Sequence, residues 1–203
     1  PARLRTIWNR LTKPKAIHLV PGNHDDGPLM TEYLHAAGIS EAKQLVGEHW
    51  QVILLDTQVR GKPHGVLGDH QLAALDQALR QHPERHALIA LHHQAVPVGC
   101  AWLDQHNLKN ADDLFAVLAR HPQQKTILFG HVHQEFDEVH HGVRLIASPS
   151  TCIQFKPLSD GFALDESGPG WRYLTLHPDG RVASQVWRLP LGQFVPDPNA
   201  TGY

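Results

Sequence analysis

Two short motifs in this chain carry side chains that suit metal chemistry, Gly22-Asn23-His24-Asp25 and Gly130-His131-Val132-His133. Each follows a short apolar run, which is typical of a strand. The first motif offers an amide oxygen beside an imidazole, and the second offers two imidazoles two residues apart. A third apolar run ends at His92-His93. Neutral imidazoles and an amide oxygen are ligands that borderline first-row metals accept, so these motifs predict a metal centre.

The predicted ligands are Asn23, His92, His131 and His133. Two metals held close together by such a set could clamp phosphoryl oxygens and convert a bridging water into hydroxide near neutral pH. The nucleophile would then be a metal-bound hydroxide. His24 directly follows Asn23 without having to share its direction, and we take it as the general acid that protonates the leaving alkoxide.

Each motif also has a plainer interpretation. Two histidines two residues apart on a strand lie on the same face of it, and such pairs are often exposed side chains without a function. In His92-His93 the neighbours would face opposite ways, so at most one is expected to bind metal. The first motif is more specific, because Gly22 permits a tight turn and Asp25 can hold an imidazole or a backbone amide. The joint order of the three motifs favours a site.

The elements that must position these motifs alternate between strand and helix and end in hairpins, which predicts an α/β layered domain. Strands that end in His or Asn place those side chains at one edge of a sheet, where ligands of α/β proteins commonly bind. The expected strands are residues 16–20, 50–56, 86–91 and 125–129; the expected helices are 28–37 with Gly38 as its stop, 69–81 with Asp69 as its cap, and 110–120; the expected hairpins are 135–139 with 143–147 and 171–176 with 181–187.

The length and composition of the chain limit the number of domains, the kinds of partner and the location of the protein. The 203 residues suit one domain, which we take to be 1–203. A net charge of -2 gives no long-range attraction to nucleic acid or anionic membrane, and neither a membrane span nor a leader is visible. Cys100 and Cys152 lack C-x-x-C spacing, and free thiols fit the cytoplasm. The oligomeric state is left open.

The ordered motifs resemble the calcineurin-like metallophosphoesterases, and within them the bacterial 3',5'-cyclic AMP phosphodiesterases. The resemblance extends from about residue 17 to residue 180. The segments that carry the closer likeness are residues 47–50, 54–59, 63–65, 99–106, 130–135, 149–157 and 169–172.

The resemblance implies a four-layer α/β/β/α sandwich with two divalent metal ions, iron or manganese, that hydrolyses cyclic AMP to 5'-AMP. By the family pattern Asn23, His92 and His131 would bind one metal, and His133 would help to bind the other. His24 would be the acid, and Asn23, His24 and His131 would also contact the substrate. Of the His92-His93 doublet, the first is expected to be the ligand because it directly follows the apolar run.

The chain departs from the family pattern upstream of Gly22. The family's D-x-H and G-D motifs normally precede this point, yet the first 20 residues contain no aspartate. We therefore expect an N-terminally truncated chain that lacks the first strands; the alternative is a natural short form that has lost activity. Other functions to be weighed are hydrolysis of a nucleotide pyrophosphate or a phospholipid precursor, and a non-catalytic metal-binding remnant.

Overall fold

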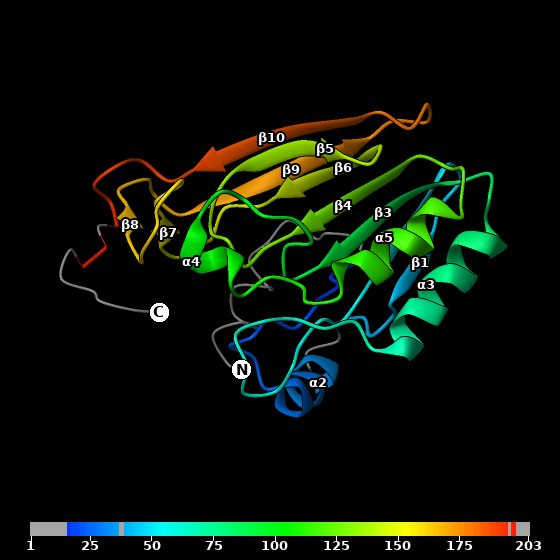
Figure 1. Ribbon diagram of the computed structural model, residues 1–203, viewed down its shortest axis with the longest axis horizontal. Helices are drawn as coiled ribbons and strands as arrows, with labels where there is room; N and C mark the ends of the chain where they lie inside the picture. The colour runs from blue at the N-terminus through cyan, green and yellow to red at the C-terminus, as the bar shows by residue number, and fades with distance from the viewer. Residues whose placement is uncertain (1–15, 37–38, 195, 198–203) are drawn as a thin grey trace.

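The computed structural model describes residues 16–36, 39–194 and 196–197 (Figure 1). The expected helix stop at Gly38 lies outside these residues. Among the described residues no helix is both long enough and apolar enough to cross a lipid bilayer.

A mixed sheet forms the centre of the fold, with strand order β1-β2-β3-β4-β6-β5. Strands β2, β3, β4 and β6 are parallel, and the edge strands β1 and β5 run antiparallel to their neighbours. Their alternate side chains are buried on both faces of the sheet, as expected of central parallel strands. The bounds are β1 Gln44–Val46, β2 Trp50–Leu54, β3 His86–Leu91, β4 Lys125–Phe129, β5 Phe136–His140 and β6 Val143–Ala147.

Helices α3 (Asp69–Gln81) and α5 (Ala111–Ala119) cover one face of this sheet. Leu75 and Leu79 of α3 and Leu114 and Leu118 of α5 are almost fully buried in the main hydrophobic core with the strand residues. Their spacing of four residues places each pair on one face of its helix, which explains why these segments fold as amphipathic helices. Helix α2 (Gly27–Ala36) lies apart from this pair, below the sheet in Figure 1.

The opposite face of the sheet is covered by the hairpin of β9 (Gly170–Leu176) and β10 (Val182–Arg188). A second core cluster of Trp50, Leu88, Ile146 and Val182 lies between the two layers. The Trp50 indole also donates to the His177 carbonyl at 2.7 Å. The described residues thus show helices, sheet and hairpin stacked in the order α/β/β, and the predicted α/β sandwich is confirmed.

Several sequence predictions differ from the structure in detail. Residues 16–20 form no strand. Among the described residues, their backbone makes one hydrogen bond to the backbone of the neighbouring segment, from the Ser40 amide to the Ile17 carbonyl, whereas a strand needs a ladder of such bonds. Asp69 is the first residue of α3 and makes no cap; Gly68 holds that position. The sequence also did not indicate β1, the short helix α4 (Ala101–Asp104) or the two-residue strands β7 (Gln154–Phe155) and β8 (Leu164–Asp165).

Helices α3 and α5 are also joined through one carboxylate. Asp76 of α3 accepts hydrogen bonds from His121 at 2.9 Å and Arg120 at 3.1 Å, both just after α5, and it is paired with Arg80 one turn along α3. The bond from His121 is the main reason why the pKa of Asp76 falls from 3.8 to about 2. Its ionised form is therefore favoured by the folded state.

We predict that Asp76→Asn lowers the melting temperature at pH 7, because the variant cannot accept these charge-assisted bonds as strongly. A carboxyl whose folded pKa is depressed stabilises the protein fully above its unfolded pKa near 3.8 and loses that contribution as the pH falls toward about 2. The difference in melting temperature between wild type and variant should therefore shrink below pH 4. Asp160→Asn, in an exposed loop, is the control. A difference that stays constant from pH 7 to pH 3 would contradict this.

Candidate metal centre

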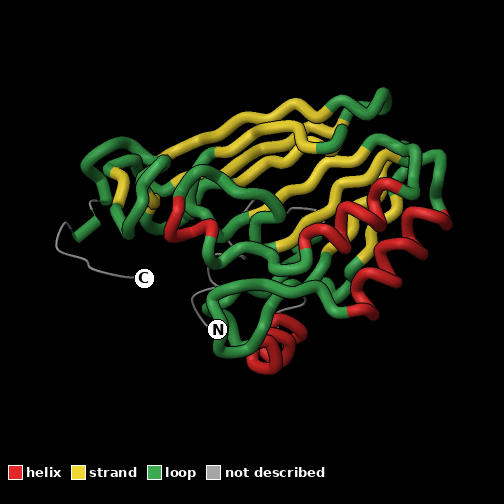
Figure 2. Tube along the Cα trace, viewed as in Figure 1, coloured by secondary structure: helices red, strands yellow, loops and turns green. Residues whose placement is uncertain are grey.

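The sheet ladder brings His92 and His131 together. Leu91 of β3 and Phe129 of β4 are paired, so the loops that follow the two strands begin side by side. The Gly130 amide then donates to the His92 carbonyl at 3.1 Å, which extends the contact by one step beyond the strands. The carboxyl ends of the central strands open into long loops here, as Figure 2 shows.

Asn23 is delivered by a tight turn. The Asp25 amide donates to the Gly22 carbonyl at 3.1 Å, and the Asp25 carboxylate accepts from the Gly22 amide at 2.8 Å. The Gln58 side chain donates to the carbonyls of Gly22 and Asp25 at 2.5 and 2.7 Å, and so fastens the turn to the loop after β2. Gly22 itself lies against the His92 ring, since a Cβ there would be 2.6 Å from the His92 Cε1.

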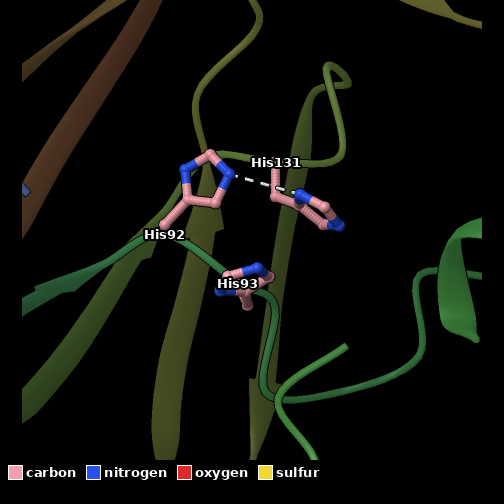
Figure 3. A group of neighbouring side chains, drawn as sticks. All are labelled: His92, His93 and His131. Carbon is pink, nitrogen blue, oxygen red and sulfur yellow. Dashed lines mark hydrogen bonds between the residues drawn. The ribbon is translucent and has the colours of Figure 1, made fainter. Parts of the chain in front are cut away.

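Three donor atoms converge at this edge of the sheet. Asn23 Oδ1 lies 2.9 Å from His92 Nε2 and 3.1 Å from His131 Nδ1, and the two ring nitrogens are 3.2 Å apart. Figure 3 shows the two rings turned toward each other, with His93 beside them. Ligand atoms about 2.1 Å from a metal and at right angles to one another lie about 3.0 Å apart, so this triangle matches one face of an octahedral site.

The possible protonation states of the two rings also favour a cation in this triangle. The Asn23 oxygen can only accept, so each ring satisfies it by turning an N–H toward it. If both rings do so, two N–H groups oppose each other at 3.2 Å; if one does not, one bond to Asn23 is lost. A metal ion removes the conflict, because all three atoms can then present lone pairs.

His93 occupies a different position from His92. It is fully buried, and its Nδ1 is 2.7 Å from the Thr57 hydroxyl oxygen. A Cβ at Gly65 would be 2.4 Å from that same Nδ1, so the close packing depends on a glycine. One ring nitrogen from each of His92, His93 and His131 can nevertheless be chosen so that the three lie within 4.8 Å.

The segment that carries His131 and His133 has an unusual backbone. Their φ angles are +61° and +51°, in the left-handed region that costs non-glycine residues about 1–3 kcal/mol. The two residues belong to a loop after β4 and not to a strand, so the period-two argument does not apply to them. The His133 ring stacks on Phe155 at 4.4 Å with an angle of 4° between the planes.

A cavity of about 220 Å³ opens over these groups. Every site residue expected from the sequence lines it: Asn23, His24, His92, His131 and His133. His24 is exposed, whereas His131 is buried. Residues that were not singled out as site residues also line it, among them Pro63, Trp102 and His106.

Burial sets the protonation state of this cluster. It lowers the pKa of His92 to about 4, with the Asp25 carboxylate opposing the shift, and the pKa of His133 to about 4. It lowers the pKa of His131 to about 2, and the neighbouring imidazoles add to the effect. The rings are therefore neutral at pH 7, which is the form that binds a metal.

Comparison with known proteins identifies the family. The model of the calcineurin-like phosphoesterases matches residues 2–135. The chain is 52% identical over 185 residues to the 3',5'-cyclic adenosine monophosphate phosphodiesterase CpdA of Escherichia coli (strain K12), covering 91% of this chain and 67% of that protein.

The CpdA proteins of two further bacteria are also similar. That of Vibrio vulnificus (strain CMCP6) is 50% identical over 190 residues, covering 93% of this chain and 69% of that protein. That of Pseudomonas aeruginosa is 41% identical over 200 residues, with 98% and 73% covered. Phosphoesterases of this kind use a two-metal centre, and the imidazole cluster at the sheet edge could hold metal. The chain belongs to the calcineurin-like phosphoesterase family.

Proposed function

We propose that this protein hydrolyses 3',5'-cyclic AMP to 5'-AMP. The observation that carries the proposal is the convergence of Asn23 Oδ1, His92 Nε2 and His131 Nδ1 within 3.2 Å of one another, on three residues that line one cavity. The reaction and substrate follow from relatives named cyclic AMP phosphodiesterases that are 41% to 52% identical over most of the chain.

Asn23, His92 and His131 would hold one divalent metal, and His133 would contribute to a second. Neutral imidazoles with an amide oxygen suit iron or manganese. Two such ions, when bound, supply Lewis acidity that polarises the phosphoryl group and lowers the pKa of water. Of the described residues that line the cavity, Asp25 is the one carboxylate, and it already accepts the Gly22 amide.

The remaining step, protonation of the leaving oxygen, is assigned to His24. In this reaction water adds to phosphorus and the bond from phosphorus to the ribose 3' oxygen breaks, so that oxygen needs a proton. His24 lines the cavity, follows the ligand Asn23 in sequence and is exposed. It can therefore give a proton to the leaving oxygen and recover one from solvent. Asn23 and His131 would contact the phosphoryl oxygens as well as a metal.

The first prediction from the proposed function concerns turnover. The protein expressed from its complete reading frame and loaded with manganese or iron(II) should convert cyclic AMP to 5'-AMP, without forming 3'-AMP, as followed by anion-exchange chromatography. Adding a chelator should abolish product formation, since the imidazole cluster has no other way to polarise the phosphate.

Two outcomes would favour other functions. Hydrolysis of bis(p-nitrophenyl) phosphate together with a nucleotide pyrophosphate or a phospholipid precursor, but not of cyclic AMP, would indicate another phosphoesterase. Stoichiometric metal binding without turnover of any phosphodiester would indicate a non-catalytic metal-binding domain.

The second prediction separates the acid from the ligands. His24→Ala should lower kcat for cyclic AMP by about two orders of magnitude, as expected for loss of a general acid, while metal content stays near that of wild type. His70→Ala, an exposed histidine on α3 outside the cavity, is the control. Loss of metal with unchanged kcat per bound metal would show that His24 is a ligand instead.

The third prediction concerns the turn that carries Asn23. Gly22→Ala should weaken Mn²⁺ binding by a factor on the order of ten or more, because its Cβ would lie 2.6 Å from the His92 ring and displace it. Gly161→Ala, where a Cβ meets nothing within 4 Å, is the matched control. Isothermal titration calorimetry measures both affinities. Equal affinities would mean that the His92 ring can move without leaving the metal.

A further inference from the structure

The cavity over the metal centre has a second part that the proposed chemistry does not use. It is formed by Pro63, Trp102, Leu103, His106 and Phe155, four apolar side chains and one imidazole. The part adjoins the metal-binding side through stacked rings, since His133 lies flat on Phe155 and Phe155 meets Trp102 edge-on at 4.9 Å. An apolar surface with a single polar group is typical of a site that orients a flat ring.

Helix α4 and the turn after it fix the position of this surface. The Cys100 thiol donates to the Ser159 carbonyl at 3.3 Å, and the Asp104 carboxylate accepts from the Val98 amide at 2.8 Å. Leu103 is buried, and its carbonyl accepts from both the Gln94 side chain at 3.0 Å and the His106 amide at 2.8 Å. The backbone of His106 is thereby tied to the core.

The ring of His106 itself is not used by the fold. In the described part of the chain its ring nitrogens make no hydrogen bond, and the side chain is half-buried beside the cavity. Burial, together with Lys109 and His64, lowers its pKa. A neutral imidazole offers one N–H and one lone pair, either of which can meet the edge of a nucleobase.

We propose that His106 is a substrate-binding residue that hydrogen-bonds the nucleobase, while Trp102 and Pro63 contact the face of the base. The proposal rests on the proposed function, which places the cyclic phosphate at Asn23, His92 and His131. With the phosphate there, the base of a nucleoside phosphate reaches the apolar part of the same cavity. His106 is then the polar group that hydrogen-bonds the base.

The test compares substrates with and without a base. Cyclic AMP and the methyl riboside 3',5'-cyclic phosphate share the reacting phosphodiester, but the second has no nucleobase. His106→Leu should raise KM for cyclic AMP about tenfold, as for one lost hydrogen bond, with little change in kcat. KM for the base-free diester should stay at the wild-type value. His106→Gln, which keeps a donor and an acceptor, should recover most of the affinity.

His49→Leu is the matched control, since His49 is an exposed histidine outside the cavity. An equal rise in KM for both substrates in His106→Leu would place His106 at the phosphate and overturn the proposal. Unchanged KM for cyclic AMP would overturn it as well.

Failure of the proposed function has a different signature. If wild type hydrolyses the base-free diester but not cyclic AMP, the cyclic-nucleotide assignment is wrong, and the base subsite is then judged by inhibition. Adenosine that inhibits wild type, and inhibits His106→Leu at least about fivefold less, would support the subsite; adenosine that inhibits neither would exclude it.

Discussion

The hydrogen bond from the Gly130 amide to the His92 carbonyl, at 3.1 Å, is the constraint on which the site depends. It continues the pairing of β3 with β4 past Leu91 and Phe129. It holds the two loops together for one residue past the strands, so His92 and His131 leave the sheet side by side. The parallel sheet therefore does more than fill the core, because its register sets the distance between the two imidazoles.

Burial and backbone strain both act against this arrangement. Burial lowers the pKa of His92, His131 and His133 far enough that none is charged at pH 7, and two of the three hold left-handed φ angles. Each feature costs free energy in the folded protein. They persist because the surrounding contacts, such as Phe155 against the His133 ring, leave the loop little alternative.

Local sequence signals were sufficient to indicate which motifs meet. The two apolar runs that lead directly into His92 and Gly130-His131 identify the carboxyl ends of strands, and β3 and β4 have the bounds that the sequence suggested. Gln58 and Thr57 could not be found in this way, since each contacts its partner across 36 residues. The run at residues 16–20 was misread for the same reason, because a short apolar run does not tell whether a neighbouring segment supplies a ladder.

The triangle of Asn23, His92 and His131 also links folding to metal binding. Without a cation the three contacts, at 2.9 to 3.2 Å, cannot all be hydrogen bonds, because any placement of the protons leaves two N–H groups or two lone pairs facing each other, and this repulsion costs free energy. Packing elsewhere in the fold must offset this cost in free energy. A metal ion that binds only the folded chain converts the conflict into stabilisation, which grows with the concentration of free metal. The same polar convergence that destabilises the fold without a cation would therefore favour metal binding at the proposed site.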